Sequence, residues 1–476
     1  MTRATTNAVR MHTTGAPDVL VLEAVAMPTP AEGEVRIAVH LAGLNYPDML
    51  IRAGRLPART MPFTPGVDVA GVVDAVGPGV SGEIAVGARV VAALFKEASG
   101  GYAEHVVTSA SSVTLLPDDL AFEHAVALPV QGLTALLALR IAGRIAPGDA
   151  VFVPAAAGGV GSLAVQLARR LGARIVVGGA STSEKRRLVL DLGADAVVDY
   201  TRASWSEDLR AATGGVGADV ILEAGGGAML EESLRALAPG GRLVVFGAED
   251  AVNPPVLDAA KTLAFLRQGQ AFVGFSLLRV PESVRRAALA ELIASARSLR
   301  VVVERYALAD AAGAHAAMEA RKTQGKVVLL TERASETPRA ALAKFVAAME
   351  AFSADALADV FAEDAIYEFP FLNPARPERY DGREAIRAGF RAVWIPGRVR
   401  IDDVRTTIHD TSDPEVVIAE GELDATHVET GRSFASRYVL VIRARGGRIV
   451  HLRDYMDAIR VARGMGRLPE LVAAFA

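Results

Sequence analysis

The sequence contains no cysteine among its 476 residues. This absence excludes disulfide bonds, thiol nucleophiles, iron–sulfur clusters and every zinc site that is built on thiolate ligands. The chain has eight histidines, and their spacing along the sequence matches no metal-ligand pattern. We therefore expect no metal site.

A large net charge and long hydrophobic runs are also missing. The 51 Lys and Arg residues are nearly balanced by 55 Asp and Glu residues, and no basic cluster predicts a surface for nucleic acid. No run approaches about 20 uncharged apolar residues, and the N-terminal segment MTRATTNAVRMHTTG lacks the apolar core of a signal peptide. We expect a cytoplasmic protein that binds neither nucleic acid nor a membrane.

What the sequence does have is length and apolar content. Half of the residues are hydrophobic and 22% are charged, which is typical of a folded globular protein. A chain of this length is too long for one ordinary core, so we expect two or three domains.

The middle of the sequence alternates apolar runs with amphipathic segments. From residue 150 to residue 274 the order is VFVPAA, SLAVQLARRLG, RIVVGGA, SEKRRLVLDLG, AVVDY, ADVILEAG, MLEESLRAL and GRLVVFGA. Short Val-, Ile- and Leu-rich runs joined by helix-period segments predict repeated strand–helix–strand units and a buried parallel sheet. We predict an α/β Rossmann domain over residues 129–274.

The flanking segments have a different pattern. EVRIAVHLAGLN, VDVAGVVDAVG and ARVVAALF are alternating or β-branched runs that Gly and Pro interrupt, as in an antiparallel sheet. Residues 275–331 return to mixed helix and strand and close with KVVLL. We predict a mostly-β, barrel-like catalytic domain formed by 1–128 with 275–331, into which the Rossmann domain is inserted.

A polar stretch separates a further domain. Residues 331–340, TERASETPRA, carry a proline and break both periodicities, which predicts a linker at 332–340. Beyond it, the helical segment ALAKFVAAMEAFSADALADVFAEDA precedes extended runs with the hairpin signals ETGR and RGG. We predict an α+β domain over residues 341–476.

The segment PAAAGGVG, residues 154–161, lies between a predicted strand and a predicted helix. Without side chains, the backbone N–H groups at a helix N-terminus are open to a pyrophosphate. A simple tight turn is the alternative, but the complete strand–helix–strand context favours dinucleotide binding. The predicted contacts are Gly158, Gly159, Val160 and Gly161.

The next strand indicates which dinucleotide binds. NAD enzymes place an Asp or Glu at its end to bind the ribose 2′-hydroxyl, whereas this chain has Gly178 and Gly179. Hydroxyl donors and a cation for a 2′-phosphate follow, so we predict NADPH as the cofactor. These predicted contacts are Ser181, Thr182, Lys185 and Tyr200. The alternative for Lys185 is a solvated helix residue.

Ordered motifs over the first 330 residues resemble the zinc-independent quinone oxidoreductase branch of the medium-chain dehydrogenase/reductase superfamily. They include GLNYPDMLIRAG (43–54), PFTPGVDVAGVVDAVGPGV (62–80), LPVQGLTA (128–135), AAGGVG (156–161) and GKVVLL (325–330). Zinc-using members carry a Cys near residue 44 and Gly-His-Glu where this chain has Gly66-Val67-Asp68. The resemblance implies metal-free hydride transfer to a quinone, an enone or an enoyl thioester.

The same resemblance assigns residues to the reacting end of the cofactor. Asn45 and Asp48 would face the nicotinamide, Lys326 or its neighbours would close over the cofactor, and the carboxamide would meet Thr134, Phe246 and Gly247. Asn45 and Tyr46 are the candidate catalytic residues, with Tyr46 as a proton donor. The alternatives for Tyr46 are packing against the nicotinamide and a proton supplied by water.

Motifs in the last domain resemble the cone-shaped α+β fold of ketosteroid isomerases, limonene-epoxide hydrolases and SnoaL-like polyketide cyclases. They are FAEDAIYEFP (361–370), DGREAIRAGF (381–390), TGRSFASRYVLVI (430–442) and GGRIVHLRDYMD (446–457). Strand periodicity places Asp454 among apolar pocket residues, where burial would raise its pKa and suit it to proton transfer. The resemblance adds Tyr367 as a pocket residue that orients an oxygen. Alternatively, Arg453, His451 or a backbone donor satisfies Asp454 structurally.

Together these patterns predict an NADPH-dependent, metal-free reductase of a quinone or activated double bond. The cone domain would act on, or bind, the same small-molecule substrate as a cyclase or isomerase. The two family resemblances also imply a homodimer and a role in secondary metabolism. The alternative is a non-catalytic NADPH-binding protein whose cone domain serves dimerisation or ligand sensing.

Overall fold

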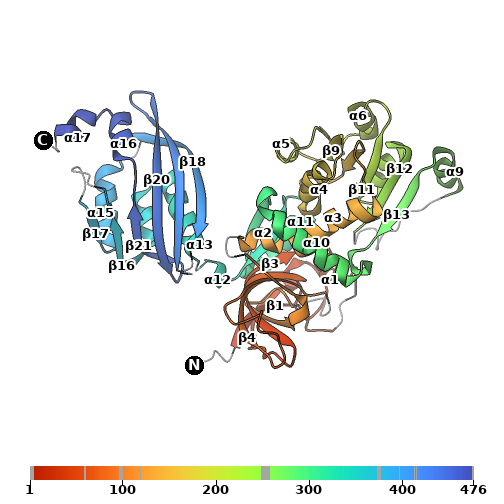
Figure 1. Cartoon of the computed structure of the whole chain (residues 1–476), viewed down its shortest axis with the longest axis horizontal. Coiled ribbons are helices and arrows are strands. Elements are labelled where there is room, and N and C mark those ends of the chain that lie inside the picture. The colour runs from red at the N-terminus through yellow and green to blue at the C-terminus, as the bar shows by residue number, and fades with distance from the viewer. Residues whose placement is uncertain are drawn as a thin grey trace. The chain divides into compact units, whose positions relative to one another are not determined.

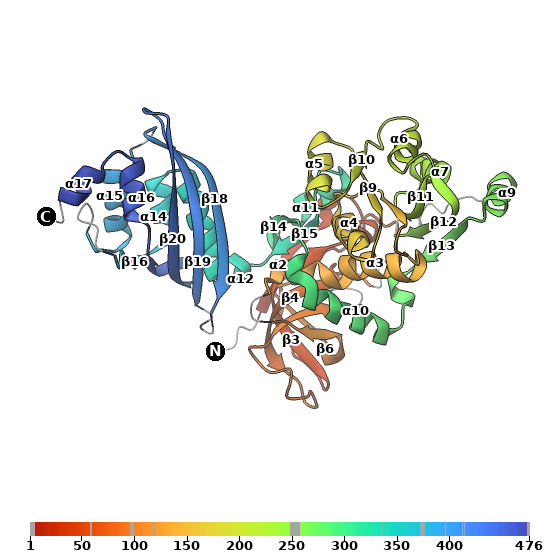
Figure 2. The same cartoon turned by 45° about the horizontal axis from the view of Figure 1, so that its top comes forward.

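The computed structural model divides into two compact units, Met1–Thr331 and Glu332–Ala476 (Figure 1, Figure 2). Each unit has its own sheets and its own core residues. The described residues are 5–57, 60–95, 100–117, 120–247, 258–335, 337–371, 377–395, 397–411, 413 and 415–473.

A seven-stranded mixed sheet forms one half of the first unit. Its last strand in sequence, β15, runs antiparallel to β3 and parallel to β14, so segments from both ends of the unit share this sheet. The strand β6 (His105–Ser109) also pairs with β3, and β1 (Thr5–Arg10) and β2 (Val21–Ala26) form a separate hairpin. The strand order is β14 (Val303–Ala307), β15 (Lys326–Leu330), β3 (Glu34–Leu44), β4 (Asp68–Val76), β5 (Arg89–Ala93) and β7 (Val113–Leu115).

A six-stranded parallel sheet forms the other half of the first unit. Its strands are short Val-, Ile- and Leu-rich runs, and all four residues of β8 are buried, as expected for a sheet with helices on both faces. The intervening helices include α4 (Gly159–Arg170), α5 (Ser183–Asp191), α6 (Trp205–Ala212) and α7 (Gly227–Arg235). The strand order is β10 (Ala196–Val198), β9 (Ile175–Gly179), β8 (Ala150–Val153), β11 (Ala218–Glu223), β12 (Leu237–Phe246) and β13 (Ala271–Phe275).

The order of these strands determines where a ligand is expected. From β8 the chain passes to β9 and β10 on one side, and then returns to β11 on the other side of β8. Loops that leave β8 and β11 therefore diverge, and in open parallel sheets ligands bind outside the carboxyl ends of the strands at such a switch point. The loop after β8 is the predicted glycine loop.

One helical stretch of the first unit, Phe122–Ala142, is long and apolar enough to cross a membrane. It comprises the α-helices α2 (Phe122–Val126) and α3 (Leu133–Leu137) and two π-helical segments, η3 (Leu128–Gly132) and η4 (Ala138–Ala142). Within its most apolar window, 78% is buried inside the protein. Its hydrophobicity is therefore that of a helix packed in a protein core.

The second unit is a six-stranded sheet covered on one face by helices. Only β16 and β21 run parallel; the other neighbours are antiparallel. The helices α13 (Pro338–Glu350), α14 (Ala354–Asp359) and α15 (Arg383–Val393) contribute to the core with the inward side chains of the strands. The strand order is β17 (Arg379–Asp381), β16 (Phe361–Glu368), β21 (Arg448–Asp454), β20 (Arg432–Arg445), β19 (Val416–His427) and β18 (Val399–Asp410).

The segment 332–340, predicted as a linker, contains helical residues. It holds α12 (Glu332–Ser335) and the first turn of α13. Thr337 is the N-cap of α13, because its hydroxyl oxygen accepts a hydrogen bond from the backbone N–H of Ala340, 3.1 Å away. Pro338 occupies the first helical position, where the missing N–H costs nothing. The proline that we took as a break in the periodicity therefore begins a helix.

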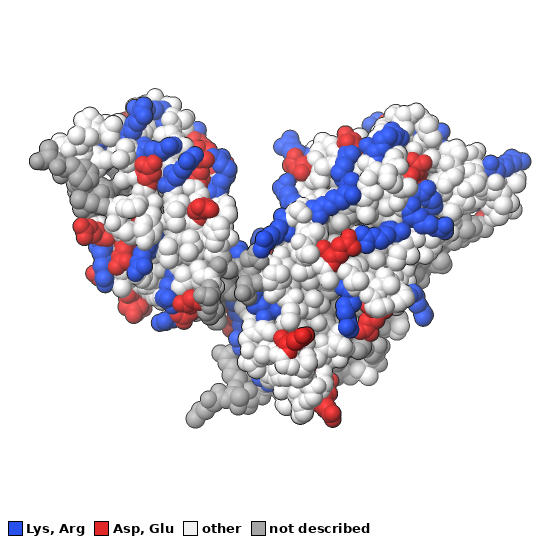
Figure 3. All heavy atoms as spheres, viewed as in Figure 1, with Lys and Arg blue, Asp and Glu red and all other residues white. Residues whose placement is uncertain are grey.

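Charged side chains are mixed in sign on the visible surface. On the face shown in Figure 3, basic residues are interspersed with acidic and uncharged residues over both units. This is the distribution that the near-balance of 51 basic and 55 acidic residues leads one to expect.

Candidate functional site

The glycine loop leads from β8 directly into α4. Gly158 is the N-cap of this 12-residue helix and has no side chain to bond the first N–H groups. Gly161 is pressed against the loop, because an added Cβ would lie 2.7 Å from Ala156 Cα. Ala155 adopts the left-handed region with φ 49°. The start of α4 is thus a bare helix N-terminus of the kind that binds a diphosphate.

A glutamine that the sequence analysis missed lies against this helix start. A Cβ at Gly159 would overlap the side-chain amide of Gln131, which comes from η3. Gln131 is only 7% exposed, and its Oε1 makes no hydrogen bond with any residue that the structure describes. The available signal was a single amide within the apolar run LPVQGLTA.

The residues predicted for the 2′-phosphate gather after β9 and β10. Thr182 is the N-cap of α5, and its hydroxyl oxygen accepts a hydrogen bond from Lys185 N at 3.2 Å. Lys185 Nζ donates to the carbonyl oxygen of Arg321 at 2.6 Å, and burial lowers the pKa of this lysine. Tyr200 packs beside Gly179, where a Cβ would lie 3.1 Å from the ring, and Ser181 is half-buried. Lys185 is therefore held by the protein, not simply solvated.

A buried polar network joins β3, β4 and β15. Lys326 Nζ donates to Asp68 Oδ2 at 2.7 Å and to Asn45 Oδ1 at 3.1 Å, while Asn45 Nδ2 donates to Asp68 Oδ1 at 2.8 Å. Lys326 and Asp68 are 1% and 0% exposed. A buried ammonium group needs a counter-charge, and Asp68 supplies it. The Lys326 side chain therefore serves this network, and the closure of Lys326 or its neighbours over the cofactor stays a prediction.

The backbone beside Lys326 does approach the glycine loop. Gly325 N donates to the carbonyl oxygen of Ala157 at 2.8 Å, and Gly325 forms an isolated parallel bridge with Gly158. The next residue along β15 is Lys326. The Asn45–Asp68–Lys326 network and the glycine loop are thus brought together by two consecutive residues.

Asp48 braces the start of α1 (Tyr46–Arg52) from inside the protein. Its carboxylate accepts hydrogen bonds from Asn45 N at 2.9 Å and Gly66 N at 3.1 Å. Burial raises the pKa of Asp48 to about 7, and the nearby charge of Asp68 adds to the increase. Burial also raises the pKa of Tyr102, which bonds Asp48 and lies 3.1 Å from His315 Nε2. Asp48 therefore positions Asn45 through its backbone.

The other residues assigned to the nicotinamide end come from three elements. Tyr46 is the first residue of α1 and is 43% exposed, in contrast to the buried Asn45 before it. Thr134 is half-buried on α3. Phe246 and Gly247 lie at the carboxyl end of β12, which is the same edge of the parallel sheet as the glycine loop. No hydrogen bond is described that joins Thr134 to Phe246 or Gly247.

In the second unit, Tyr367 and Asp454 form a buried pair. The Tyr367 hydroxyl donates to Asp454 Oδ2 at 2.8 Å. The tyrosine ring lies among Phe361, Phe369 and Phe390, with centroid distances of 5.7, 4.8 and 5.3 Å. The side chains of Arg453 and His451, which we considered as partners of Asp454, instead bond Glu368. The two candidate residues are therefore together, but inside an aromatic core.

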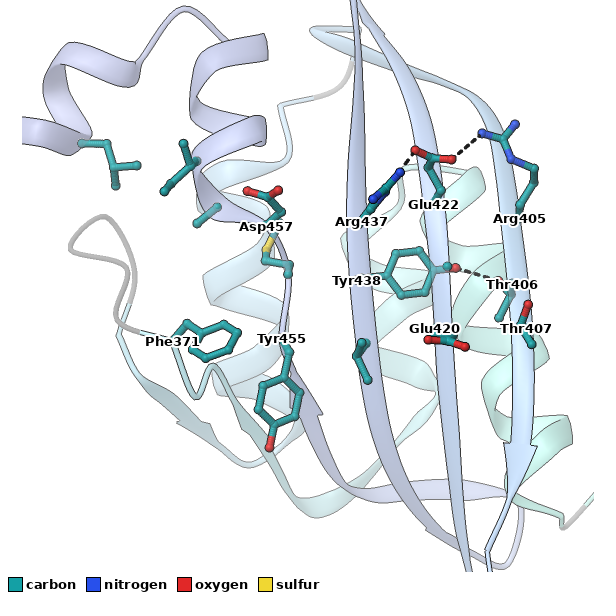
Figure 4. Close-up of a pocket in the computed structure, with 16 residues that line it drawn as sticks. Phe371, Arg405, Thr406, Thr407, Glu420, Glu422, Arg437, Tyr438, Tyr455 and Asp457 are labelled. Carbon is teal, nitrogen blue, oxygen red and sulfur yellow. Dashed lines mark hydrogen bonds and ion pairs between the residues drawn. The ribbon is translucent and has the colours of Figure 1, made fainter.

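The cavity described in this unit, of about 820 Å³, does not include either residue (Figure 4). Along β20, Arg437 and Val439 line it and alternate with Tyr438, whose side chain belongs to the core. The cavity therefore lies on the sheet face opposite α13–α15. Its remaining lining residues are Phe371, Arg405, Thr406, Thr407, Glu420, Gly421, Glu422, Tyr438, Tyr455, Met456, Asp457, Ala458, Ile459 and Leu471.

Three family descriptions match separate parts of the chain. Residues 31–118 match the alcohol dehydrogenase GroES-like domain, and residues 159–295 match the zinc-binding dehydrogenase family. Residues 342–452 match the SnoaL-like domain. The first two matches fall in the first unit and the third in the second unit.

Similar proteins cover the first unit over nearly their whole length. Quinone oxidoreductase of Sus scrofa is 33% identical over 330 residues, which are 68% of this chain and 97% of the relative. The 2-haloacrylate reductase of a Burkholderia species is 32% identical over 332 residues, 68% of this chain and 98% of the relative. The structure of Escherichia coli quinone oxidoreductase with NADPH is 31% identical, with a TM-score of 0.62, over 68% of this chain and 99% of that one.

Proposed function

Through its first unit the chain belongs to the quinone oxidoreductase family of the medium-chain dehydrogenase/reductase superfamily, and from this premise we propose a metal-free reductase of quinones and conjugated carbon–carbon double bonds. The chain is an NADPH-dependent oxidoreductase. The observation that carries the proposal is the junction at Gly325 and Lys326, where the bare helix N-terminus meets a buried ammonium–carboxylate–amide network.

The residues of the first unit fit NADPH. The start of α4 would hold the diphosphate, since only glycine leaves room at Gly161 and the first turn lacks a side-chain cap. The Thr182 hydroxyl and the Lys185 ammonium group would hold the 2′-phosphate, because an ammonium group has three donors and the Arg321 carbonyl uses one. Bound NADPH supplies the hydride that reduces the substrate.

The network at Asn45 fits a site in which positioned polar side chains take the place of a metal ion. Both ends of the Asn45 amide are held, by Asp68 and by Lys326, so the amide has one orientation. Zinc-using relatives carry a Cys near residue 44 and a His where this chain has Val67, whereas this chain has no cysteine and the Val67 side chain has no donor atom. The substrate carbon must then be electrophilic by conjugation, as it is in quinones, enones and 2-haloacrylates.

Tyr46 is the proposed proton donor. Reduction of a conjugated double bond adds a hydride and a proton, and the phenol of Tyr46 follows Asn45 directly in the sequence. Its 43% exposure leaves the side chain open to a substrate, unlike the buried phenol of Tyr102. Tyr46 would give its proton to the carbon or oxygen that becomes negative when the hydride arrives.

Stopped-flow measurement of NADPH absorbance tests this proposal. The acceptors are a quinone, an enone, a 2-haloacrylate and an enoyl thioester, and a saturated ketone of matched size is the control. We expect oxidation of NADPH with at least one conjugated acceptor and none with the saturated ketone. Binding of NADPH without turnover on the whole panel would favour the non-catalytic alternative, and faster turnover of the saturated ketone would contradict the proposed substrate class.

For the second unit, we propose a binding role toward the same substrate or its product, in a secondary-metabolic setting. The observation that favours binding over cyclase or isomerase chemistry is the enclosure of Tyr367, which is 1% exposed among phenylalanine rings. A catalytic Asp454–Tyr367 pair would need an opening to its carboxylate. The cavity on the opposite face of the sheet contains neither residue and is lined by residues of β18, β19 and β20 among others (Figure 4).

Product analysis separates these two roles of the second unit. Mass spectrometry of products from the wild type, Asp454→Asn and Tyr367→Phe should give the same compounds if the unit only binds. A product that disappears in Asp454→Asn but persists in a matched surface variant, Asp403→Asn, would restore proton transfer by Asp454.

A further inference from the structure

We propose that Gln131 is a cofactor-binding residue that recognises the junction between the diphosphate and the nicotinamide ribose of NADPH. Its Nε2 would donate to a diphosphate oxygen, and its Oε1 would accept a hydrogen bond from a ribose hydroxyl. The inference rests on the proposed function, because it assumes that the start of α4 holds a dinucleotide.

The first support is the place of the amide. Gln131 lies on η3, and its side chain packs on the backbone of Gly159, the first residue of α4. Gly159 has no Cβ, and this absence is what lets the amide reach the helix N-terminus. A residue with a side chain at position 159 would displace the amide, so the glycine here makes room for a protein group as well as for a ligand.

The second support is the state of the amide. Gln131 is only 7% exposed, and its Oε1 has no hydrogen-bond partner among the described residues. Buried side-chain oxygens are nearly always bonded, and an isolated one needs an explanation. A ligand that brings a hydroxyl to the start of α4 supplies the missing donor.

The position along the chain indicates which part of the cofactor is recognised. Gln131 precedes Thr134 by three residues on the same helical stretch, so the two residues lie within one helical turn of each other. Thr134 is the residue proposed for the nicotinamide carboxamide. Gln131 then lies between that carboxamide and the diphosphate, which is where the nicotinamide ribose joins the two.

A glutamine on a neighbouring helix supplies a matched control. Gln166 lies on α4, and its amide is fully engaged within the protein. Nε2 donates to the carbonyl oxygens of Ser162 at 2.9 Å and Arg300 at 3.0 Å, and Oε1 accepts from Arg300 N at 2.8 Å. Gln166 is thus a structural glutamine, whereas Gln131 lacks such bonds at Oε1.

The experiment compares Gln131→Met with Gln166→Met in the full chain. Methionine has nearly the same volume as glutamine without the amide. The affinities for NADPH and for adenosine 2′,5′-bisphosphate are measured by calorimetric titration, and the stability of the ligand-free protein is measured by thermal unfolding. The bisphosphate carries the adenosine half of the cofactor alone, so it reports on Lys185 and Thr182 but not on the nicotinamide ribose.

For Gln131→Met we expect an NADPH dissociation constant about tenfold larger. Its affinity for the bisphosphate should change less than twofold. The melting temperature of the ligand-free variant should stay the same or rise, because an apolar side chain replaces an unbonded buried oxygen. For Gln166→Met we expect unchanged affinities and a lower melting temperature.

Four results would decide against the inference or its premise. Equal NADPH affinity of Gln131→Met and wild type overturns it, and so does an equal loss of affinity for the bisphosphate. If Gln131→Met does not fold, Gln131→Glu replaces it, because glutamate keeps the shape of the side chain. Repulsion between this carboxylate and the diphosphate should weaken NADPH binding more than tenfold. Unchanged NADPH binding of Gln131→Glu overturns the inference. Failure of the wild type to bind NADPH overturns the proposed function instead.

Discussion

Asp48 shows how burial alone changes what a residue does. Its carboxylate accepts two backbone hydrogen bonds, yet burial raises its pKa to about 7 from the ordinary 3.8. Between these two pH values the folded protein holds a proton that the unfolded chain has lost. The free energy of unfolding of the first unit therefore falls as the pH rises through this range.

The Asp48→Asn variant tests this sign. The variant cannot titrate at position 48, so the stability of the wild type relative to the variant should fall by roughly 2 to 3 kcal/mol between pH 5 and pH 8. The comparison with the variant is needed because His315 also affects stability. Burial lowers the pKa of His315 to about 3, so below pH 6.5 its contribution to the free energy of unfolding falls as the pH falls, opposite to that of Asp48. Thermal unfolding at both pH values provides the measurement, and a constant difference would contradict the raised pKa.

Tyr46 gives a prediction about turnover. If its phenol donates the proton, Tyr46→Phe should lower kcat with an enone by about 100-fold, because general acid catalysis contributes at least that much. The dissociation constant for NADPH should not change, since no proposed cofactor contact is removed. Stopped-flow and titration data would show this split, and normal kcat in Tyr46→Phe would assign the proton to water.

Lys185 gives a prediction about cofactor choice. Lys185→Ala should raise the KM for NADPH about tenfold and leave that for NADH nearly unchanged, because only NADPH carries the 2′-phosphate. Steady-state rates with both cofactors on one acceptor are the measurement. Equal changes for the two cofactors would mean that the lysine supports the loop at Arg321, not the phosphate.

Candidate residues could be chosen from the sequence more easily than their partners in the structure. Motif resemblance singled out Asn45 and Lys326, which are 281 positions apart, but spacing along the chain says nothing about a contact over that separation. Gln131 was missed because one amide in an apolar run has the pattern of an ordinary helix residue. Its significance depends on which atoms lack partners, which only coordinates show.

At the scale of elements, the ion pair between β15 and β4 connects strands from opposite ends of the first unit. Lys326 and Asp68 are both buried, and removal of one partner leaves an uncompensated charge. Lys326→Met should therefore destabilise the first unit by about 3 to 5 kcal/mol. The double variant Lys326→Met, Asp68→Leu should recover part of this loss.

Calorimetry of the two variants and the wild type checks this coupling. The double variant removes both charges, so the remaining cost is mainly that of the Asn45 bonds and of altered packing. A double variant that is less stable than Lys326→Met would show that Asp68 is stabilised by something other than the lysine.

Elements with strong hydrophobic periodicity could be predicted, and an element that begins with an unusual residue could not. The runs VFV and GRLVVF gave strands β8 and β12, because only a buried parallel strand explains a continuous apolar run between helical segments. Pro338 was taken as a break in the helical periodicity. At the first position of α13 a proline starts the helix, and the preceding Thr337 cap was the signal to notice.

At the scale of the whole molecule, the two units have no strand in common and separate cores. The core cluster around Phe345, Tyr367 and Phe390 contains residues of the second unit alone, and those around Ile37 and Phe152 contain residues of the first. We therefore expect that each core can unfold without the other. The sequence predicted this division, because the periodicity changed character after residue 330.

Calorimetry of the full chain should accordingly show two unfolding transitions. NADPH at 100 times its dissociation constant stabilises only the state that binds it, by about 2.7 kcal/mol, so one transition should move to higher temperature and the other should stay. The moving transition is assigned with Lys326→Met, which should lower the same one. A single transition that moves as a whole would mean that the units unfold together, and the second unit would then depend on the cofactor bound by the first.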